Sequence, residues 1–381
     1  MQVVIIPSWY FNAGSASIAG ILFHEHAIEL IKLGIDAQIA YPGYSGSSWR
    51  SSKSYYAIEN EVPTWRGQGW FPPKIHKSII AWWIQKCGLE IIQHFKVHTS
   101  PDVIHAQGYQ AGWIAEFIFH QTGIPYIATE HYSGFLNSAI PARNLPFIRT
   151  AFNNAKFVTA VSPGLKEAMT HHTDADISVI PNDFNPDIFF QEPHRKQINH
   201  FQWLTIGEPI YTKGLDLVLE AFSAVAEALP NQKFRLVLAD QIPYRQALER
   251  MAKQLGISDM IDFAGLLTPK EVAALINQSH VLISASRFET FGKTMLEANA
   301  CGVPVVATRT AGSTYILASE KQGILCEQGS AKALSKAMIQ MYRQYDTFGA
   351  AEITAAVASR FRRSDLLSQW INLYNACVHD R

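Results

Sequence analysis

Short apolar runs alternate with amphipathic segments along most of the chain. Residues 3–6 are four consecutive apolar residues, typical of a buried strand. Phe23, Ala27, Leu30 and Ile31 follow at helical spacing, and Gly34 stands where such a helix would end. The same pattern predicts further strands at 35–41, 103–105, 124–129, 157–161 and 177–180. Strands alternating with helices indicate parallel sheets joined by crossover helices.

A polar stretch at 191–199 interrupts this alternation, which then starts again. Strands are predicted at 201–206, 234–239, 281–284 and 303–307. We therefore expect an α/β fold with two doubly wound, Rossmann-like domains, one over 1–190 and one over 200–362. A ligand is expected at the carboxyl ends of the strands, in a cleft between the domains. An apolar stripe over 364–377 predicts one more helix at the end of the chain.

Composition narrows the classes of protein. The chain has 381 residues, of which 48 % are hydrophobic and 17 % charged, so it can bury a sizeable core. Lys plus Arg and Asp plus Glu both number 32, so no dominant field for nucleic acid is expected. The four cysteines lie far apart, which fits neither a zinc knuckle nor a disulfide framework. With no signal peptide or apolar run of about 20 residues, we expect a cytoplasmic protein.

The run SRFETFGKTMLEANACGVP, residues 286–304, carries the clearest chemistry. It joins two predicted strands through a turn at Gly292 that opens a helix. Free amides at a helix start can hold an anion, and the helix dipole favours it. Glu289 lies in the turn and Glu297 further along the helix, so two carboxylates could accept hydrogen bonds from sugar hydroxyls of an elongated ligand.

This run resembles the E-x7-E signature of retaining glycosyltransferases of family 4, also described as glycosyl transferases group 1, of bacterial polysaccharide and glycolipid type. Lys213-Gly214 resembles the lysine–glycine segment of the family. Residues 102–108 and Thr129-Glu130-His131 resemble two signatures of its amino-terminal domain. The resemblance implies the GT-B fold, in which two Rossmann-like domains face each other across a cleft. It also implies that the helix within 363–381 returns toward the first domain.

The resemblance assigns roles to individual residues. Lys213 contacts the donor diphosphate, and the amides near Gly292 also help to stabilise its negative charge. Glu289 lies near the donor sugar hydroxyls, Glu297 binds the ribose, and His131 lies near the reacting sugar, where it donates a hydrogen bond or helps to stabilise developing charge. Gly20 lets the backbone approach the diphosphate. The predicted catalytic residues are therefore His131 and Glu289, and the predicted donor-binding residues are Gly20, Lys213, Phe291, Gly292, Lys293 and Glu297. His105 is expected to be a satisfied core histidine.

The implied activity is that of a retaining hexosyltransferase-type enzyme, which moves a sugar from a nucleotide sugar to a glycan or lipid-linked acceptor. UDP- or GDP-sugars are the expected donors, and a polyprenyl-diphosphate-linked sugar is one expected acceptor. The leaving phosphate, rather than a protein nucleophile, is thought to assist the incoming hydroxyl. No cofactor and no metal ion is expected. The cellular role implied is cell-surface polysaccharide synthesis.

Some positions depart from the family pattern. Glu208 stands where members often carry an arginine that contacts the diphosphate, and Asp240-Gln241 replaces a glycine-containing segment. A non-catalytic, glycosyltransferase-like binding subunit therefore remains an alternative. A nucleotide-sugar epimerase or a phosphorylase of the same architecture is another. An NAD dehydrogenase is disfavoured because no Gly-x-Gly-x-x-Gly follows the first strand.

The stretch 65–98 combines five basic residues with six aromatic residues and one acid, Glu90. This composition suits an anionic bilayer interface, although a core helix with exposed lysines would give the same pattern. We expect a peripheral protein at the inner face of the cytoplasmic membrane, bound through this stretch.

Overall fold

The computed structural model describes residues 1–11, 20–43, 54–67, 77–98, 100–192, 199–207, 210–239 and 245–379. The chain forms two compact units. Unit 1 comprises Met1–Pro181 together with Ser364–Arg381, and unit 2 comprises Asn182–Arg363. The first change of unit thus falls at Pro181, earlier than the polar stretch at 191–199 that the sequence pattern suggested as the division, most of which lies outside the described residues.

Unit 1 contains one eight-stranded sheet in the order β3-β4-β2-β1-β5-β6-β7-β8. All neighbouring strands are parallel except the β3–β4 pair. Because the chain continues to opposite sides of β1, this sheet is doubly wound, as expected. Its strands are β1 (Gln2–Pro7), β2 (Asp36–Tyr41), β3 (Tyr55–Glu59), β4 (Val62–Arg66), β5 (Val103–Gln107), β6 (Tyr126–Glu130), β7 (Phe157–Ala160) and β8 (Ile177–Val179).

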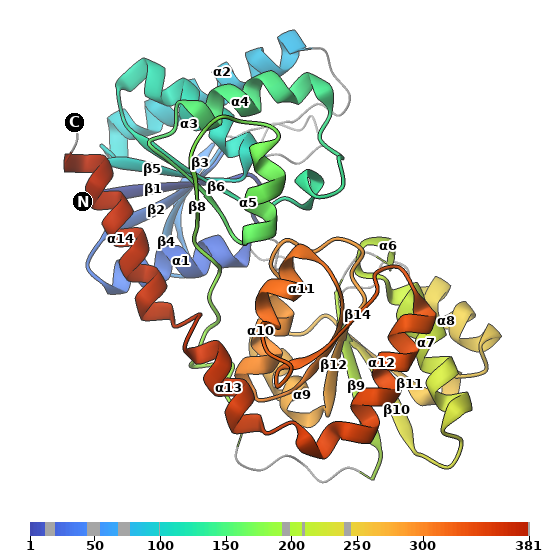
Figure 1. The fold of residues 1–381 in the computed structure, drawn as a ribbon. Helices are drawn as coiled ribbons and strands as arrows, with labels where there is room; N and C mark the ends of the chain where they lie inside the picture. Colours follow the sequence, from blue (N-terminus) through green and yellow to red (C-terminus); the bar gives the residue numbers. More distant parts are fainter. Residues whose placement is uncertain are drawn as a thin grey trace. The chain divides into compact units, whose positions relative to one another are not determined.

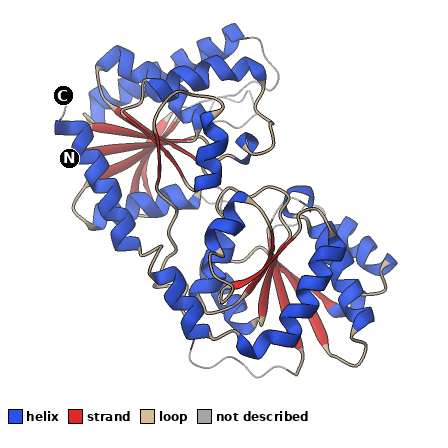
Figure 2. Ribbon diagram, viewed as in Figure 1, coloured by secondary structure: helices blue, strands red, loops and turns tan. Residues whose placement is uncertain are grey.

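Helices cover both faces of this sheet (Figures 1 and 2). In the order of the chain they are α1 (Ile21–Lys32), α2 (Lys77–His98), α3 (Tyr109–Thr122), η1 (Ser133–Phe135), η2 (Ala142–Asn144), α4 (Leu145–Asn153), α5 (Pro163–Thr170) and α14 (Arg363–His379). On one face, Val3 and Ile5 of β1 pack with Phe23 of α1 and with Trp370 and Tyr374 of α14. The last helix of the chain therefore completes the core of unit 1, which confirms the return that the resemblance implied.

The β3–β4 hairpin was not predicted from the sequence. Its two turn residues, Asn60 and Glu61, both have positive φ, at 44° and 73°. Such turns match the twist of a hairpin, but their usual sequence signal is Asn-Gly or Asp-Gly. With Glu at the second position, the turn lacks that signal. The aromatic residues that follow the turn were instead interpreted as part of a membrane-facing stretch.

Unit 2 contains one six-stranded sheet in the order β11-β10-β9-β12-β13-β14, with all neighbours parallel. Counted along the chain this is the order 3-2-1-4-5-6, that of the dinucleotide-binding Rossmann fold. The strands are β9 (Phe201–Ile206), β10 (Phe234–Ala239), β11 (Ile261–Gly265), β12 (Val281–Ser284), β13 (Val305–Thr308) and β14 (Gly323–Cys326).

Helices also flank this second sheet (Figure 2). They are α6 (Ile210–Lys213), α7 (Leu215–Ala228), α8 (Arg245–Gln254), η3 (Ser258–Met260), α9 (Pro269–Gln278), α10 (Lys293–Ala300), α11 (Ala311–Ile316), α12 (Ala331–Gln344), η4 (Tyr345–Thr347) and α13 (Ala350–Ala358). The main core packs α7, α8 and α12 against the sheet around the fully buried residues Trp203, Phe222 and Met338. Each unit therefore has its own hydrophobic core, as a separately folding domain requires.

Candidate active site

The topological switch point of unit 2 lies between β9 and β12, which are neighbours in the sheet. From β9 the chain continues to β10 on one side, and from β12 it continues to β13 on the other. The two connections therefore diverge, and they leave room for a ligand at the carboxyl ends of these strands. The segment with Lys213 follows β9, and the segment with Glu289 follows β12.

Lys213 and Glu289 form an ion pair at this switch point. The Lys213 Nζ lies 2.7 Å from Glu289 Oε2. Their side chains are 29 % and 13 % exposed, so both are largely shielded but reachable from solvent. An ammonium beside a carboxylate offers a cation for phosphate oxygens and an acceptor for sugar hydroxyls. The structure thus brings together two residues that are 76 positions apart in the sequence.

Gly214 allows the two connections to approach closely. Its backbone is left-handed, with φ +65°, and a Cβ there would lie 2.1 Å from the carbonyl oxygen of Ala285. No other residue type fits such a position without a shift of the backbone. The glycine after Lys213 therefore sets how near the lysine comes to the β12 segment.

Arg287 ties the same two segments together. Its guanidinium donates to both carboxylate oxygens of Asp216, at 2.9 and 2.6 Å, and to the Tyr211 carbonyl oxygen at 2.7 Å. Its backbone amide donates to the Thr212 carbonyl oxygen at 2.8 Å. The guanidinium carbon also lies 4.4 Å from the centre of the Tyr211 ring. Arg287 thus contacts residues on both sides of Lys213, and a bidentate pair of this kind fixes geometry as well as charge.

The turn after Glu289 opens helix α10. Gly292 is its N-cap residue, with φ +92°, and Lys293 is its first residue. Because glycine has no side chain, it caps none of the helix amides, which suits an anion at this end. Glu297 lies one turn into the helix and is buried, with 8 % exposed. The predicted donor-binding residues of the E-x7-E run therefore lie on one connected turn and helix.

Phe291, one of the predicted donor-binding residues, precedes Gly292 in the turn. Its ring is buried, 2 % exposed, and packs edge-on against Phe361 and Tyr315. The Phe291 side chain is thus part of the core of unit 2, and only its backbone remains for a donor. The Gly312 amide donates to the Glu289 carbonyl oxygen at 2.8 Å, which holds the turn from the neighbouring α11.

The other two predicted residues, His131 and Gly20, lie in unit 1. His131 follows β6, and its ring meets the rings of Trp9 and Phe23 edge-on, with centroids 6.1 and 5.3 Å away. Gly20 is the N-cap of α1, and a Cβ there would lie 2.6 Å from the Trp9 carbonyl oxygen and 3.2 Å from the Phe23 ring. Both residues therefore lie against the same two aromatic residues, Trp9 and Phe23, near the carboxyl ends of β1 and β6.

The environment of the His131 imidazole favours its neutral form. Burial, with a smaller contribution from the nearby His26, lowers the pKa of His131 to about 3. A neutral ring supplies no full positive charge, so this environment favours hydrogen bonding over charge stabilisation, and both roles stay predictions. The preceding Glu130 is fully buried, and burial raises the pKa of its carboxyl to about 7. Its Oε1 accepts the His131 and Tyr132 amides at 2.8 and 2.7 Å.

Three residues of these sites were missed by the sequence reasoning. Arg287 stands inside the recognised run, and Gln107 and Glu130 stand inside the two amino-domain signatures. Gln107 Oε1 lies 2.7 Å from His131 Nε2. Their positions at strand ends were a usable signal. Arg287 and Gln107 have partners that are distant in sequence, Asp216 and His131, so only the fold reveals these contacts.

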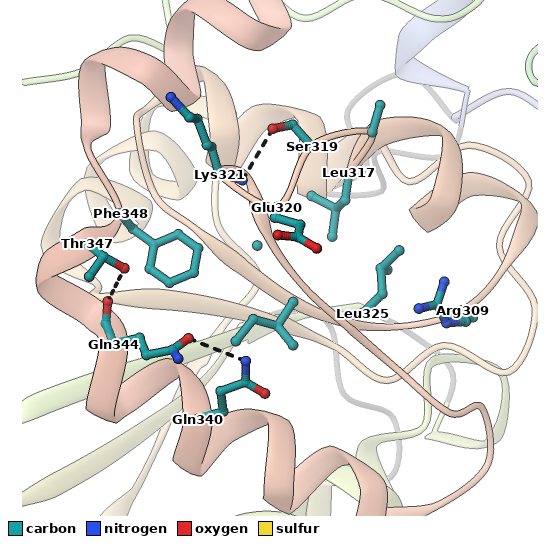
Figure 3. A pocket seen from close by; sticks show the side chains of 13 residues that line it. Arg309, Leu317, Ser319, Glu320, Lys321, Leu325, Gln340, Gln344, Thr347 and Phe348 are labelled. Atoms are coloured by element: carbon teal, nitrogen blue, oxygen red, sulfur yellow. Dashed lines mark hydrogen bonds between the residues drawn. The ribbon is translucent and has the colours of Figure 1, made fainter.

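A cavity of about 580 Å³ lies elsewhere in unit 2 (Figure 3). It is lined by Arg309, Leu325, Gln340, Gln344 and Phe348 among others, from the ends of β13 and β14 and from α12. In Figure 3 the Gln340 amide donates to Gln344 Oε1 at 3.3 Å, and Thr347 bonds to the backbone of Gln344. None of the residues predicted from the sequence lines this cavity, so it is separate from the Lys213–Glu289 pair.

Glu208 and Asp240-Gln241, where the chain departs from the family pattern, lie outside the described residues. Within the ranges that are described, no group of three or more His, Cys, Asp or Glu side chains could hold a metal ion. In the same ranges, no helix has the length and apolar character needed to cross a membrane. All four cysteines belong to those ranges, where they are buried and form no disulfide.

Comparison with known proteins first places the fold. The structure matches sucrose-phosphate synthase from Thermosynechococcus elongatus with a TM-score of 0.83, at 17 % identity over 100 % of both chains. It matches HepE of Anabaena, solved in complex with UDP and glucose, with a TM-score of 0.77, at 16 % identity over 98 % of this chain and 99 % of the other. The two Rossmann-like units are those of a GT-B fold.

Two family models then cover most of the chain. Residues 19–187 match "Glycosyltransferase Family 4" and residues 188–351 match "Glycosyl transferases group 1". The gpi3 protein of the Schizosaccharomyces pombe phosphatidylinositol N-acetylglucosaminyltransferase is 23 % identical over 235 residues, 60 % of this chain and 51 % of its own. The chain thus spans about half the length of this curated relative. The protein belongs to the family 4 glycosyltransferases.

Proposed function

We propose that this protein transfers a sugar from a nucleotide sugar to an acceptor, and that unit 2 binds the donor diphosphate. The ion pair of Lys213 and Glu289 at the switch point of a Rossmann sheet carries this proposal. The Lys213 ammonium and the first amides of α10 would face the diphosphate, whose two negative charges match them. Glu289 would accept hydrogen bonds from the donor sugar, and Glu297 from the ribose.

The reaction proposed is that of a retaining hexosyltransferase in cell-surface polysaccharide or glycolipid synthesis. Glu289 Oε2 is held by the Lys213 ammonium at 2.7 Å, which suits a positioning role for this carboxylate. This supports a mechanism in which the protein positions groups and stabilises charge while the leaving phosphate assists the acceptor hydroxyl. His131 is proposed to hydrogen-bond to the transferred sugar.

We propose that the nucleotide of the donor is UDP. HepE, with the same fold, was solved with UDP and glucose. The test is protection of this protein against thermal unfolding by UDP-, GDP- and dTDP-sugars, repeated with Lys213→Ala. Lys321→Ala is the matched control, because Lys321 pairs with Glu352 at 2.8 Å in the same unit but is not one of the predicted site residues. Protection by none of the donors, or equal protection of both variants, would contradict the proposal.

A non-catalytic binding subunit is the second candidate, and the carboxylate of Glu208 in place of an arginine favours it. The two candidates give different results when radiolabelled donor is incubated with membrane extracts. Transfer of label to lipid or glycan supports the enzyme. Nucleotide binding at micromolar concentrations with neither transfer nor donor hydrolysis supports the binding subunit.

The acceptor is proposed to be a glycan or polyprenyl-diphosphate-linked sugar reached at an anionic membrane surface. Helix α2 supports this with a row of exposed side chains, Trp82, Leu89 and Val97, at 53, 45 and 75 % exposed. Lys86 lies in the same row, with its Nζ 5.6 Å from the Trp82 ring centre. Other aromatic residues of the stretch, Trp65, Trp83 and Phe95, are buried and belong to the core. Trp70 and Phe71 lie outside the described residues.

Flotation with phosphatidylglycerol vesicles at low salt tests this surface. Trp82→Ala and Lys86→Ala are expected to weaken flotation, and Leu33→Ala is the control because Leu33 is equally exposed, at 54 %, just after α1. Wild-type protein that stays unbound at low salt, or an equal loss in the control, would exclude this role for α2.

A further inference from the structure

Gln107 stands between two histidines of unit 1. Its Oε1 lies 2.7 Å from Nε2 of His131. Its Nε2 lies 3.1 and 3.4 Å from the two ring nitrogens of His105. Gln107 is 3 % exposed and His105 is fully buried, so water does not compete for the contact between them.

The position of the amide over His105 decides which end of Gln107 faces His131. A group in the plane of an imidazole and nearly equidistant from both nitrogens would overlap the carbon between them, so the amide nitrogen lies over the ring face. Both ring nitrogens already have partners at 2.7 Å, the hydroxyls of Tyr374 and Thr129. An N–H group is favourable over the electron-rich ring face, whereas a carbonyl oxygen there is not. The NH₂ group therefore faces His105 and the oxygen faces His131.

The orientation of the His105 ring is fixed by a residue of α14, the last helix of the chain. The Tyr374 hydroxyl of α14 lies 2.7 Å from His105 Nδ1 and 2.7 Å from His26 Nε2. Thr129, the other partner of His105, is bonded in turn to Thr159 at 2.7 Å. These hydrogen bonds fix the orientation of the His105 ring, so one face of the ring is held toward the Gln107 amide.

An amide oxygen only accepts hydrogen bonds. We propose that Gln107 is a positioning residue that holds His131 in the tautomer protonated at Nε2, with His105 and Tyr374 setting the orientation of the Gln107 amide. Nδ1 of His131 is then the ring nitrogen that carries the lone pair. This inference rests on the role of His131 given under the proposed function.

The experiment is ¹⁵N–¹H correlation of histidine side chains in the full-length protein, with the His131 signals assigned by their loss in His131→Asn. The wild type is expected to show the Nε2–H tautomer. Gln107→Leu removes the acceptor and is expected to give a mixture of tautomers. Gln38→Leu is the matched control, because Gln38 is a second buried glutamine of unit 1 and its Oε1 lies 3.3 Å from a different histidine, His94.

Transfer kinetics provide the second readout. Gln107→Leu is expected to lower kcat about tenfold or more with the donor KM within about twofold, because an imidazole in the wrong tautomer loses an interaction made in the transition state. The Nδ1–H tautomer in the wild type, or an unchanged tautomer in Gln107→Leu, overturns the inference. An unchanged rate in His131→Asn with the expected tautomer results would instead contradict the proposed role of His131 in transfer.

Discussion

The ammonium of Lys213 and the carboxylate of Glu289 lie 2.7 Å apart, so the cation that a diphosphate would use already has an anionic partner. This makes the two possible substitutions opposite in effect. Lys213→Ala removes a charge-assisted contact, and UDP affinity is expected to fall about 10- to 100-fold. Glu289→Gln leaves the ammonium without its anionic partner, so UDP should bind at least as tightly while sugar transfer falls.

Calorimetric titration with UDP measures both changes, with Lys321→Ala as the reference lysine. Weaker UDP binding by Glu289→Gln would show that the carboxylate supports the diphosphate site instead of competing with it.

Substitution of Arg287 should loosen the switch point without removing either member of the ion pair. Arg287→Lys keeps the charge but loses the bidentate contact with Asp216 and the stacking on Tyr211. We expect about tenfold weaker UDP binding and a loss of about 1–2 kcal/mol in the free energy of unfolding.

A double-mutant cycle with Asp216→Asn separates the pair from other effects. If the two losses simply add, Arg287 does not act through Asp216.

Gly214 and Gly256 provide a matched pair of substitutions. Both have left-handed backbones, with φ of +65° and +70°, but a Cβ at 214 would lie 2.1 Å from the Ala285 carbonyl oxygen, whereas at 256 nothing lies within 4 Å. Gly256→Ala is expected to cost only the backbone strain, about 1–2 kcal/mol. Gly214→Ala should cost about 1–3 kcal/mol more, through overpacking.

Urea unfolding monitored by circular dichroism gives both values. The same loss in the two variants would mean that the β9 and β12 segments do not need their close approach.

Glu130 should make the stability of the protein depend on pH in an unusual direction. Burial raises the pKa of its carboxyl from 4.5 to about 7, so between these values the folded state retains a proton that the unfolded state has released. The contribution of Glu130 to stability therefore falls as pH rises from about 4.5 to about 7, by up to about 3 kcal/mol. Glu130→Gln removes this fall.

The difference in free energy of unfolding between Glu130→Gln and the wild type should accordingly increase in favour of the variant from pH 5 to pH 7 and then level off. Glu167→Gln, at an exposed position of the same unit, is the control. A difference that is constant over this range would contradict a raised pKa. His131 acts in the opposite sense, since its lowered pKa makes stability rise with pH between about 3 and 6.5.

The predictions from the sequence were most accurate for features that depend on residues adjacent in the chain. The buried strand 281–284 was predicted because apolar runs are typical of parallel sheets covered on both faces. The turn at Gly292 was predicted because its glycine and the two glutamates form a contiguous run. The placement of Lys213 beside Glu289 then follows from the Rossmann strand order.

Other features depend on partners that are distant in the chain. Phe291 was predicted to bind the donor, and the burial of its ring depends on Tyr315 and Phe361. Trp65 of the β3–β4 hairpin is buried because its ring stacks on His94 of α2, and that hairpin has no glycine in its turn to signal it. Gln107 could not be assigned because its orientation depends on a hydroxyl of α14.

The crossing of the chain into unit 2 at Asn182 and back at Ser364 has a consequence for synthesis. Unit 2 is continuous in sequence, so the ribosome delivers all of it before the segment that fills the core of unit 1. Trp370 and Tyr374 reach their places beside Val3 and Ile5 only after all of unit 2 has been made. Most of unit 1 is made first, but one apolar face of its sheet stays uncovered until then. Unit 1 therefore completes its folding after unit 2.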